Sequence, residues 1–308
     1  MTKTGLLFAG QGAQKLGMAR DLYDNFDIVK ATYDEASEIL GYDLRQLIDH
    51  DADKLGETKY TQPAILTTSV AILRLLDAHH ITYDVVAGLS LGEYSALVAS
   101  GSLPFADAVR LIAKRGQYMA EAAPTGSGKM VAVMNTAADV IETACQQASF
   151  NSKGIVSPAN YNTPGQIVIG GEVAAVDAAV ELLTAAGVKR MIPLKVSGPF
   201  HTALLQPASE KLAVALETVA FKPFEKPLIS NSTAQVMAFD DIKALLTRQV
   251  MEPVKFYDSV ETMISMGVTD IIEIGPGKIL SGFVKKIDKT VGITHVEDVP
   301  TFNAILEK

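Results

Sequence analysis

The sequence Gly-Leu-Ser-Leu-Gly at residues 88–92 carries the strongest signal for chemistry in the chain. It follows an apolar run at residues 83–87 and precedes a helix-like stretch at residues 93–100, which is the strand–turn–helix context of a nucleophile elbow. Such a sharp turn brings the backbone close to its neighbours, so side chains at the two glycines would collide. The serine is then exposed at the carboxyl end of a strand, and free N–H groups of the next helix face the reacting carbonyl. The pattern predicts Ser90 as a nucleophile, and the alternative is a tight structural turn.

A serine hydroxyl needs a base to remove its proton, and the chain has five histidines. His201 follows a Gly-Pro turn and lies just before a predicted helix at residues 203–218, where a side chain is well placed to reach a site. The other four histidines are expected at ordinary structural positions. His79 and His80 fall at a helix end, His50 in a solvated loop, and His295 in or beside a strand. From the residues alone, a base role for His201 stays open against a structural one.

Strands and helices alternate along most of the chain, which predicts an α/β fold. We expect strands at residues 5–9, 83–87 and 269–274, and helices at residues 62–79 and 105–122. Pro63 falls in the first turn of the first helix, where proline is tolerated. Because strands joined by helices form a mostly parallel sheet covered on both faces, we expect a large α/β-hydrolase-like domain with a parallel sheet.

The middle of the chain follows a different pattern and predicts an inserted subdomain. A Gly-Ser-Gly joint at residues 126–128 opens it. The elements that follow are strand, helix, strand, strand, helix and strand, at residues 130–134, 137–147, 155–157, 166–169, 173–186 and 189–194. This order is typical of a ferredoxin-like βαββαβ unit. We therefore expect a ferredoxin-like subdomain at residues 125–196, inserted into a catalytic domain of residues 1–124 and 197–308.

The composition excludes several classes of protein. The chain has 308 residues, of which 48% are hydrophobic and 20% charged, as in ordinary globular proteins. A net charge of −8 without a Lys/Arg cluster argues against nucleic-acid binding, which needs a basic face. The only cysteine, Cys145, is interpreted as a small buried residue, so neither an internal disulfide nor a thiolate metal cluster is expected.

Targeting and cofactor signals are also weak. The N-terminus lacks the long apolar segment of a signal peptide, and no stretch approaches the roughly 20 apolar residues of a membrane span. We therefore expect a cytoplasmic protein without a membrane partner. No metal-ligand spacing is present, and the Gly-Ser-Gly-Lys at residues 126–129 lacks the earlier glycine and the following Ser or Thr of a phosphate loop.

Several separated motifs closely resemble the bacterial malonyl-CoA:acyl-carrier-protein transacylases, and the resemblance covers essentially the whole chain. They are an N-terminal glycine loop, the nucleophile motif, an arginine segment and three further stretches, at residues 8–14, 88–94, 114–119, 157–160, 198–201 and 273–278. Several motifs in the right order are far more specific than a single one. The resemblance assigns Ser90 as the nucleophile and His201 as the base. It also implies an oxyanion hole from the backbone N–H groups of Gln11 and Leu91, each worth about 3 kcal/mol in a comparable site.

The resemblance further implies how the substrate is selected and how the base is held. Arg115 matches the family's substrate-carboxylate residue, and a guanidinium can hold a malonyl carboxylate through two parallel hydrogen bonds. Phe200 stands where related enzymes carry Phe with malonyl and Ser with methylmalonyl. The sequence offers no obvious triad acid, and the resemblance explains this, because the backbone carbonyl of Gln249 would orient the histidine instead.

The implied reaction is a two-step transfer from malonyl-CoA to the phosphopantetheine thiol of acyl carrier protein, which would feed fatty-acid or polyketide chain extension. No permanently bound cofactor is expected, since the carrier brings its own phosphopantetheine. Acyl carrier proteins are themselves acidic, so docking on this acidic chain requires a local basic patch. If His201 has an ordinary imidazole pKa near ~6.5, acylation should fall as the pH drops through that value.

Two rival functions remain at this stage. A serine esterase or thioesterase would explain the turn at Ser90, but neither Arg115 nor the glycine loop at Gln11. A non-catalytic partner that kept the fold is disfavoured by the combination of Ser90, His201 and Arg115. The first rival is distinguished by whether a malonyl-enzyme survives in water and discharges to a thiol, and the second by whether malonyl-CoA adds mass to the protein at all.

Overall fold

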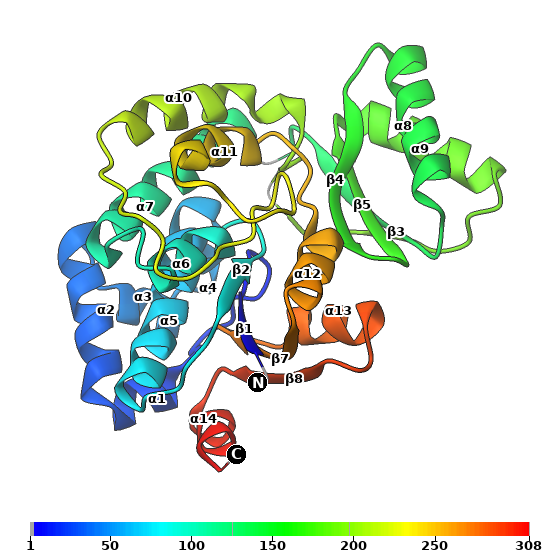
Figure 1. Ribbon diagram of the computed structural model, residues 1–308. Coiled ribbons are helices and arrows are strands. Elements are labelled where there is room, and N and C mark those ends of the chain that lie inside the picture. The colour runs from blue at the N-terminus through cyan, green and yellow to red at the C-terminus, as the bar shows by residue number, and fades with distance from the viewer. Residues whose placement is uncertain (1–2, 125, 197, 308) are drawn as a thin grey trace.

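The computed structural model describes residues 3–124, 126–196 and 198–307. Figure 1 shows two units, a larger one built around β1, β2, β7 and β8 and a smaller one with β3, β4 and β5 beside it. The larger sheet is parallel and has the order β2-β1-β7-β8. Its strands are β1 (Lys3–Phe8), β2 (Val85–Gly88), β7 (Val268–Ile274) and β8 (Gly292–Val296). The predicted α/β fold with a parallel sheet is therefore confirmed.

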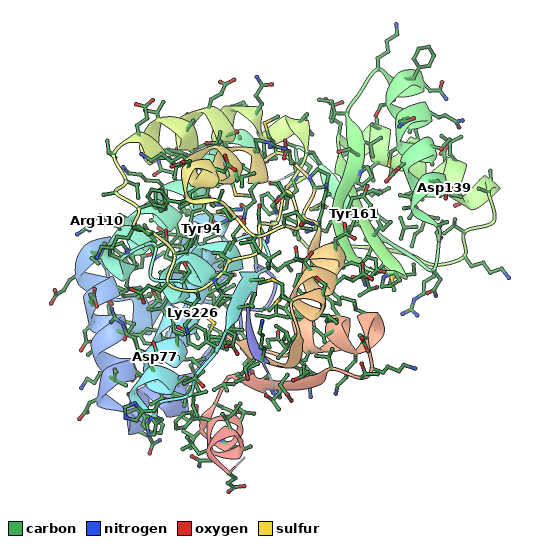
Figure 2. All side chains as sticks on the ribbon, in the orientation of Figure 1. Asp77, Tyr94, Arg110, Asp139, Tyr161 and Lys226 are labelled. Atoms are coloured by element: carbon green, nitrogen blue, oxygen red, sulfur yellow. The ribbon has the colours of Figure 1, made fainter. Side chains whose placement is uncertain are left out.

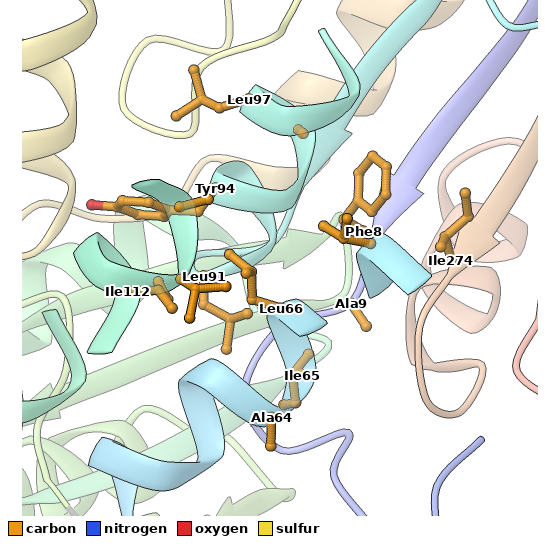
Figure 3. Close-up of a cluster of buried hydrophobic side chains, with 14 of the residues drawn as sticks. Phe8, Ala9, Ala64, Ile65, Leu66, Leu91, Tyr94, Leu97, Ile112 and Ile274 are labelled. Atoms are coloured by element: carbon orange, nitrogen blue, oxygen red, sulfur yellow. The ribbon is translucent and has the colours of Figure 1, made fainter. Parts of the chain in front are cut away.

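Helices cover both faces of this sheet, because its strands carry apolar side chains on both sides. In β1, Leu6 and Phe8 belong to a core formed largely with helices from the first half of the chain. Leu7, between them, packs into a second core that includes residues of α12 and α13. Figure 3 shows part of the first core, with Phe8 and Ile274, which pair on neighbouring strands, and the helix residues Leu66 and Leu91 among the labelled side chains. Phe8 at the end of β1 pairs with Gly88 of β2 and with Ile274 of β7, so these three strands end at the same edge of the sheet.

The helices predicted at residues 62–79, 93–100, 105–122 and 203–218 are all present; the third coincides with α7 (Phe105–Ala122), the other three differ at their ends, and the remaining helices of the larger unit were not predicted. The helices of this unit are α1 (Arg20–Asn25), α2 (Asp27–Leu40), α3 (Leu44–His50), α4 (Ala52–Gly56), α5 (Thr58–Ala78), α6 (Gly92–Ala99), α7 (Phe105–Ala122), α10 (Gln206–Glu217), α11 (Ile242–Gln249), α12 (Phe256–Ser265), α13 (Ile279–Ile287) and α14 (Val299–Leu306), with 3₁₀ turns η1 (Ala203–Leu205) and η2 (Phe239–Asp241). The helix expected from residue 203 is first a 3₁₀ turn, because Pro207 lies in the first turn of α10. None of the helices in the described ranges is long and apolar enough to cross a membrane.

The prediction for Pro63 is wrong. The helix α5 begins at Thr58, so Pro63 lies inside it rather than in its first turn. The additional first turn of α5 is stabilised by polar hydrogen bonds. Thr61 donates its hydroxyl to the carbonyl of Leu55 and its backbone N–H to the carbonyl of Glu57. Periodicity starts only where apolar residues begin, and it therefore missed a polar first turn.

The smaller sheet has the ferredoxin-like topology that the sequence predicts. Its strands are β3 (Lys129–Met134), β4 (Val156–Thr163), β5 (Gln166–Gly171) and β6 (Met191–Pro193), joined through α8 (Ala138–Ser152) and α9 (Val173–Ala185). They are antiparallel and have the order β4-β5-β3-β6. The predicted division into residues 1–124 and 197–308 around residues 125–196 remains a prediction, since Thr125 and Ser197 at its two ends lie outside the described residues.

The two faces of the small sheet have different roles. Val131 and Val133 of β3 point into a core with α8 and α9, which cover the outer side in Figure 1. Met130 and Ala132, the alternate residues, belong to the core of the larger unit and line a cavity between the two units. Figure 2 shows Tyr161 on β4 of the small unit and Tyr94 inside the larger one. The small sheet therefore serves as one wall of that cavity.

Candidate active site

Three parallel strands end at the same edge of the large sheet, and the loops that follow them line a cavity of about 330 Å³. The loop after β1 contributes Gly10 and Gln11, and the turn after β2 contributes Ser90. The opposite wall is the small sheet, through Met130, Ala132, Asn160, Asn162, Gln166 and Val168. Ligands of open α/β sheets typically bind outside the carboxyl ends of the strands, so this is the candidate active site.

The turn at Ser90 has the strain and the crowding of a nucleophile elbow. Ser90 has a φ of 55°, in the left-handed region that non-glycine residues rarely occupy. A Cβ on Gly88 would lie 2.1 Å from the carbonyl carbon of Gly92, and one on Gly92 would lie 2.2 Å from the carbonyl oxygen of Phe8. Only glycine fits at either position, which is the steric requirement that the sequence pattern suggests.

Asn231 locks this turn from the other half of the chain. Its side-chain oxygen accepts a hydrogen bond from the N–H of Ser90 at 2.7 Å, and its amide group donates to the carbonyl of Gly88 at 2.7 Å. Asn231 is 1% exposed, so both bonds are shielded from water. The sequence prediction missed this residue, which lies 141 positions from Ser90 and belongs to none of the motifs considered.

His201 is positioned as a base for Ser90. Its Nε2 lies 2.8 Å from the Ser90 hydroxyl, and its Nδ1 lies 2.7 Å from the backbone carbonyl of Gln249. Since a carbonyl only accepts, Nδ1 carries the proton and Nε2 is free to accept the one from Ser90. The geometry is therefore that of a serine–histidine pair oriented by a neutral carbonyl.

The pKa expected for His201 is corrected by the structure. Burial, together with the nearby positive charge of Arg115, lowers the pKa of His201 to about 4 instead of the ordinary value near 6.5. The imidazole is therefore neutral, and able to accept a proton, across the whole range above about pH 5. A sequence cannot reveal this shift, because it depends on complete burial and on a charge that is distant along the chain.

Arg115 reaches the nucleophile directly. One terminal nitrogen of its guanidinium donates to the Ser90 hydroxyl at 3.1 Å and to the side-chain oxygen of Gln249 at 2.9 Å, and the other donates to Gln62 at 2.8 Å. The side chain is fully buried over the ring of Tyr94, and its Nε has no hydrogen-bond partner within the described part of the chain. None of these hydrogen bonds goes to a carboxylate. Arg115 does not itself line the cavity, but lies immediately behind Ser90.

Gln249 connects the members of the site through both its backbone and its side chain. Its carbonyl holds His201, its side-chain oxygen accepts from Arg115, and its amide group donates to the backbone carbonyl of Ser90 and to Glu93. The second acceptor oxygen of Glu93 takes the N–H of Asn231 at 3.0 Å. Burial raises the pKa of Glu93 to about 7. The sequence prediction assigned only the carbonyl of Gln249 and missed Glu93, although a carboxylate inside an otherwise apolar helix is a readable signal.

The predicted oxyanion donors are available. Gln11 lines the cavity beside Ser90, and Leu91 follows the nucleophile at the start of α6. Within the residues that the structure describes, neither backbone N–H donates to a protein acceptor. The side chain of Gln11 is held by Thr58 at 3.0 Å, which fixes the loop that carries the N–H.

The remaining predicted residues separate into those at the site and those outside it. Phe200 is 6% exposed and lines the cavity next to His201. Cys145 is buried in the small unit, as predicted. Elsewhere, His50 is the last residue of α3 rather than part of a loop, and His295 lies in β8. His201 is therefore the histidine that the fold brings to Ser90.

Comparisons with known proteins agree with this geometry. A family model described as an acyl transferase domain matches residues 6–303. The malonyl CoA-acyl carrier protein transacylase of Bacillus subtilis (strain 168) is 45% identical over 309 residues, covering 100% of this chain and 97% of the relative. The protein of the same name from Staphylococcus aureus (strain MSSA476) is 43% identical over 308 residues, covering 98% of this chain and 99% of the relative.

Solved structures give the same result. The crystal structure of MCAT from Streptococcus pneumoniae has a TM-score of 0.97 and 65% identity, and the match covers 99% of each chain. A complex of a type II PKS acyl-carrier protein with its malonyl-transacylase matches with a TM-score of 0.96 and 41% identity, again over 99% of each chain. The match extends over both units of the fold, including the small sheet.

Proposed function

The chain belongs to the acyl transferase family, and we propose that it transfers the malonyl group of malonyl-CoA to the phosphopantetheine thiol of an acyl carrier protein through an ester on Ser90. The observation that carries this proposal is the position of the Ser90 hydroxyl, 2.8 Å from the base His201 and 3.1 Å from the buried guanidinium of Arg115. The first contact supports nucleophilic catalysis. The second supports an acyl group that carries a negative charge.

In the first half of the reaction, the Ser90 oxygen attacks the thioester carbonyl while its proton passes to Nε2 of His201. The negative charge that develops on the carbonyl oxygen is stabilised by the N–H groups of Gln11 and Leu91. The carbon–sulfur bond then breaks, the sulfur takes the proton from Nε2, and coenzyme A leaves. The malonyl group remains as an ester on Ser90.

The second half reverses these steps with a different thiol. His201 removes the proton from the phosphopantetheine thiol, and the sulfur attacks the ester carbonyl. The same two N–H groups stabilise the tetrahedral intermediate, and Ser90 leaves with the proton returned by His201. The acyl-enzyme never needs water, and the cavity wall of Met130, Ala132 and Phe200 is largely apolar, which favours transfer to a thiol over hydrolysis.

Arg115 selects the substrate in this proposal. Its guanidinium makes hydrogen bonds only to neutral groups, and its Nε has no partner within the described part of the chain. The buried carboxyl of Glu93 acts on it only through space, so a bound carboxylate would supply the direct pairing that the free site lacks. Because Arg115 lies behind Ser90, the malonyl carboxylate must exchange with the hydrogen bond between the guanidinium and the Ser90 hydroxyl. An acetyl group cannot make this exchange, which leaves the charge uncompensated.

The requirements of this reaction are modest. It needs no permanently bound cofactor, because the carrier protein brings phosphopantetheine and malonyl-CoA brings the acyl group. The product would serve fatty-acid chain extension, and a polyketide carrier is an alternative acceptor. We propose that the protein acts in the cytoplasm, as its sequence leads us to expect.

The direct test is the intact mass of the protein after mixing with malonyl-CoA. The wild type should gain one malonyl group, retain it in buffer for longer than a catalytic cycle, and lose it when a thiol is added. Ser90→Ala should show no gain and keep its thermal unfolding midpoint within a few degrees, since Ala occupies the same space. An adduct on the Ala variant would remove Ser90 from its role, and rapid loss of malonyl to water alone would favour a hydrolase.

A further inference from the structure

Arg115 is bound on two sides by side-chain amides. One terminal nitrogen of its guanidinium donates to Oε1 of Gln249 at 2.9 Å, and the other donates to Oε1 of Gln62 at 2.8 Å. Both glutamines are 1% exposed, and Arg115 is fully buried. The central carbon of the guanidinium lies 5.3 Å from the centre of the Tyr94 ring, which Figure 3 shows among apolar side chains. The positive charge is therefore held in the interior by neutral oxygens.

The other buried arginine of the described residues is neutralised directly. Arg45 is 6% exposed. Two of its nitrogens donate to the two carboxylate oxygens of Asp49, one of them at 3.0 Å. Because a charge in a protein interior is stable mainly when it is paired, this direct contact is the expected arrangement. Arg115 departs from it, although a buried carboxylate is available nearby.

That carboxylate belongs to Glu93, which is 1% exposed and lies in α6. Its charge and that of Arg115 act on each other through space. In the described part of the chain, however, each hydrogen bond of the guanidinium goes to a neutral oxygen. The amide of Gln249 lies between the two charges, because its Oε1 accepts from Arg115 while its Nε2 donates to Glu93. One side-chain amide therefore separates the carboxylate from the guanidinium.

The surroundings of Gln249 favour a single orientation of its amide. Its Nε2 donates to two acceptors, the backbone carbonyl of Ser90 at 2.9 Å and one carboxylate oxygen of Glu93. A reversed amide would place its oxygen against both acceptors and its NH₂ group against the guanidinium, which only donates. The second carboxylate oxygen of Glu93 accepts the N–H of Asn231 at 3.0 Å. Glu93 is thus held on the far side of the amide from Arg115.

This separation favours a substrate that brings its own carboxylate. Hydrogen bonds between two charged groups are about twice as strong as those between neutral groups, so neutral amide oxygens leave the guanidinium incompletely stabilised. The carboxylate of a malonyl ester on Ser90 would gain the contact that the protein withholds. A protein carboxylate in that contact would reduce the gain, because specificity is a difference between two binding free energies.

We propose that the side-chain amide of Gln249 is a specificity determinant, which keeps the carboxylate of Glu93 away from Arg115 and so reserves the guanidinium for the carboxylate of the substrate. The inference rests on the proposed function and adds a second residue to its selection of malonyl. It gives the side chain of Gln249 a role separate from that of its backbone carbonyl, which holds His201.

The experiment exchanges the amide and the carboxylate. The double change Glu93→Gln with Gln249→Glu keeps the net charge and the set of side-chain groups, but it places the carboxylate against Arg115 and the amide behind it. The new amide can donate to the new carboxylate and still accept the N–H of Asn231. The bond to the Ser90 carbonyl is lost, and this loss affects all acyl substrates alike.

The two single changes are the matched controls. Glu93→Gln removes the carboxylate but leaves the amide of Gln249 against Arg115, whereas Gln249→Glu places a carboxylate against Arg115 in the presence of Glu93. For each protein and for the wild type, kcat/KM for ester formation on Ser90 is measured from malonyl-CoA and from acetyl-CoA by intact mass after rapid quenching. Thermal unfolding verifies that each variant is folded.

The exchanged protein should lose its preference for malonyl. We expect its malonyl-to-acetyl ratio of kcat/KM to fall about 30-fold or more, because a carboxylate of the protein then occupies the guanidinium. Gln249→Glu alone should lower the ratio in the same direction. Glu93→Gln should retain or increase the wild-type ratio, since it removes a through-space counter-charge and leaves the amide in place.

Two results would overturn the role of the Gln249 side chain. One is a wild-type ratio in the exchanged protein and in Gln249→Glu, of which the single variant carries the test alone if the exchanged protein is unfolded. The other is an equal fall of the ratio in Glu93→Gln, which would assign the selection to the charge of Glu93 rather than to its separation from Arg115. A wild-type protein that forms no ester from malonyl-CoA would instead contradict the proposed function.

Discussion

The two sides of the cavity are built on opposite principles. On the side of the large sheet, Ser90 is surrounded by His201, Arg115 and Gln249, which are at most 4% exposed and hold one another through hydrogen bonds. On the side of the small sheet and the rim, the side chains are exposed or make few bonds, as Lys195 and Ile279 do. In the proposed function, the chemistry would therefore depend on groups that are already fixed before the substrate arrives.

The largest difference between the two sides of the cavity should appear when an asparagine on each side is replaced by alanine. Asn231→Ala removes two buried bonds to the turn of Ser90, and we expect it to lower the free energy of unfolding by about 2–4 kcal/mol. Ester formation should fall about 100-fold, because a displaced nucleophile loses its alignment. Both effects are measured by denaturant unfolding and by rapid-quench acylation.

Asn162→Ala is the matched control on β4, where Asn162 makes one side-chain bond, to Gln166 at 2.9 Å. It should cost about 1 kcal/mol of stability, and any loss of activity should appear mainly in KM. Equal losses of stability and rate in the two variants would remove the distinction between the two sides.

The second prediction concerns how the activity depends on pH through His201, on the side of the large sheet. Because the pKa of His201 is lowered to about 4, kcat/KM for malonyl-CoA should stay flat from pH 7 to about 5 and then fall about tenfold per pH unit below about 4. A bound malonyl carboxylate offsets the charge of Arg115, one cause of the low pKa, so the limb in kcat should lie at higher pH than the limb in kcat/KM. A limb in kcat/KM near 6.5 would show that His201 is solvated in the free protein.

The same shift has a consequence for stability. Between pH 6.5 and about 4 the unfolded chain binds a proton at His201 that the folded protein does not, so this group makes the folded state less stable as the pH falls through that window. A shift of this size corresponds to about 3 kcal/mol. Replacing His201 with Gln should reduce that dependence, measured as the unfolding free energy at several pH values. An unchanged slope between pH 6.5 and 4 would contradict the buried neutral imidazole.

The smallest effect should come from the apolar wall. Phe200 lines the cavity next to His201, and Phe200→Ser should widen acceptance of methylmalonyl-CoA relative to malonyl-CoA. One methyl group is worth only about 1–3 kcal/mol of discrimination, so the ratio of kcat/KM values should change by about 10-fold and by no more than about 200-fold. A variant that discriminates as the wild type does would make Phe200 a packing residue only.

The sequence predicted features that depend on adjacent residues, and it did not predict those that depend on contacts between distant segments. Local patterns were sufficient for the turn at Ser90, because the steric need for Gly88 and Gly92 is written in adjacent residues. The strand and helix order of the small unit was readable for the same reason. Asn231 and Gln62 were not, because each acts through a contact between distant segments. Glu93 stands out as a carboxylate in an apolar helix, but its partners Gln249 and Asn231 are distant in the sequence.

The family resemblance supplied the roles of Arg115 and Gln249, but not how they are held. That both bond to each other, and that Arg115 touches Ser90 in the free protein, depends on how the fold places α7, α11 and the turn at Ser90 relative to one another. The lowered pKa of His201 has the same origin. Burial and through-space charge are properties of the assembled fold, and no spacing in the sequence encodes them.

The central claim is that a buried guanidinium beside the nucleophile selects a carboxylate-bearing acyl group. Its most direct test is the ratio of ester formation on Ser90 from malonyl-CoA and from acetyl-CoA in Arg115→Ala, with Arg115→Lys as the partial replacement. The ratio is the proper measurement, because loss of the bonds to Gln62 and Gln249 would affect both substrates alike. We expect malonyl transfer to fall by about 30- to 5,000-fold, corresponding to about 2–5 kcal/mol, with acetyl transfer unchanged or raised and Lys restoring part of the preference. An equal fall with both substrates would contradict the account, since Arg115 would then only support the structure of the site.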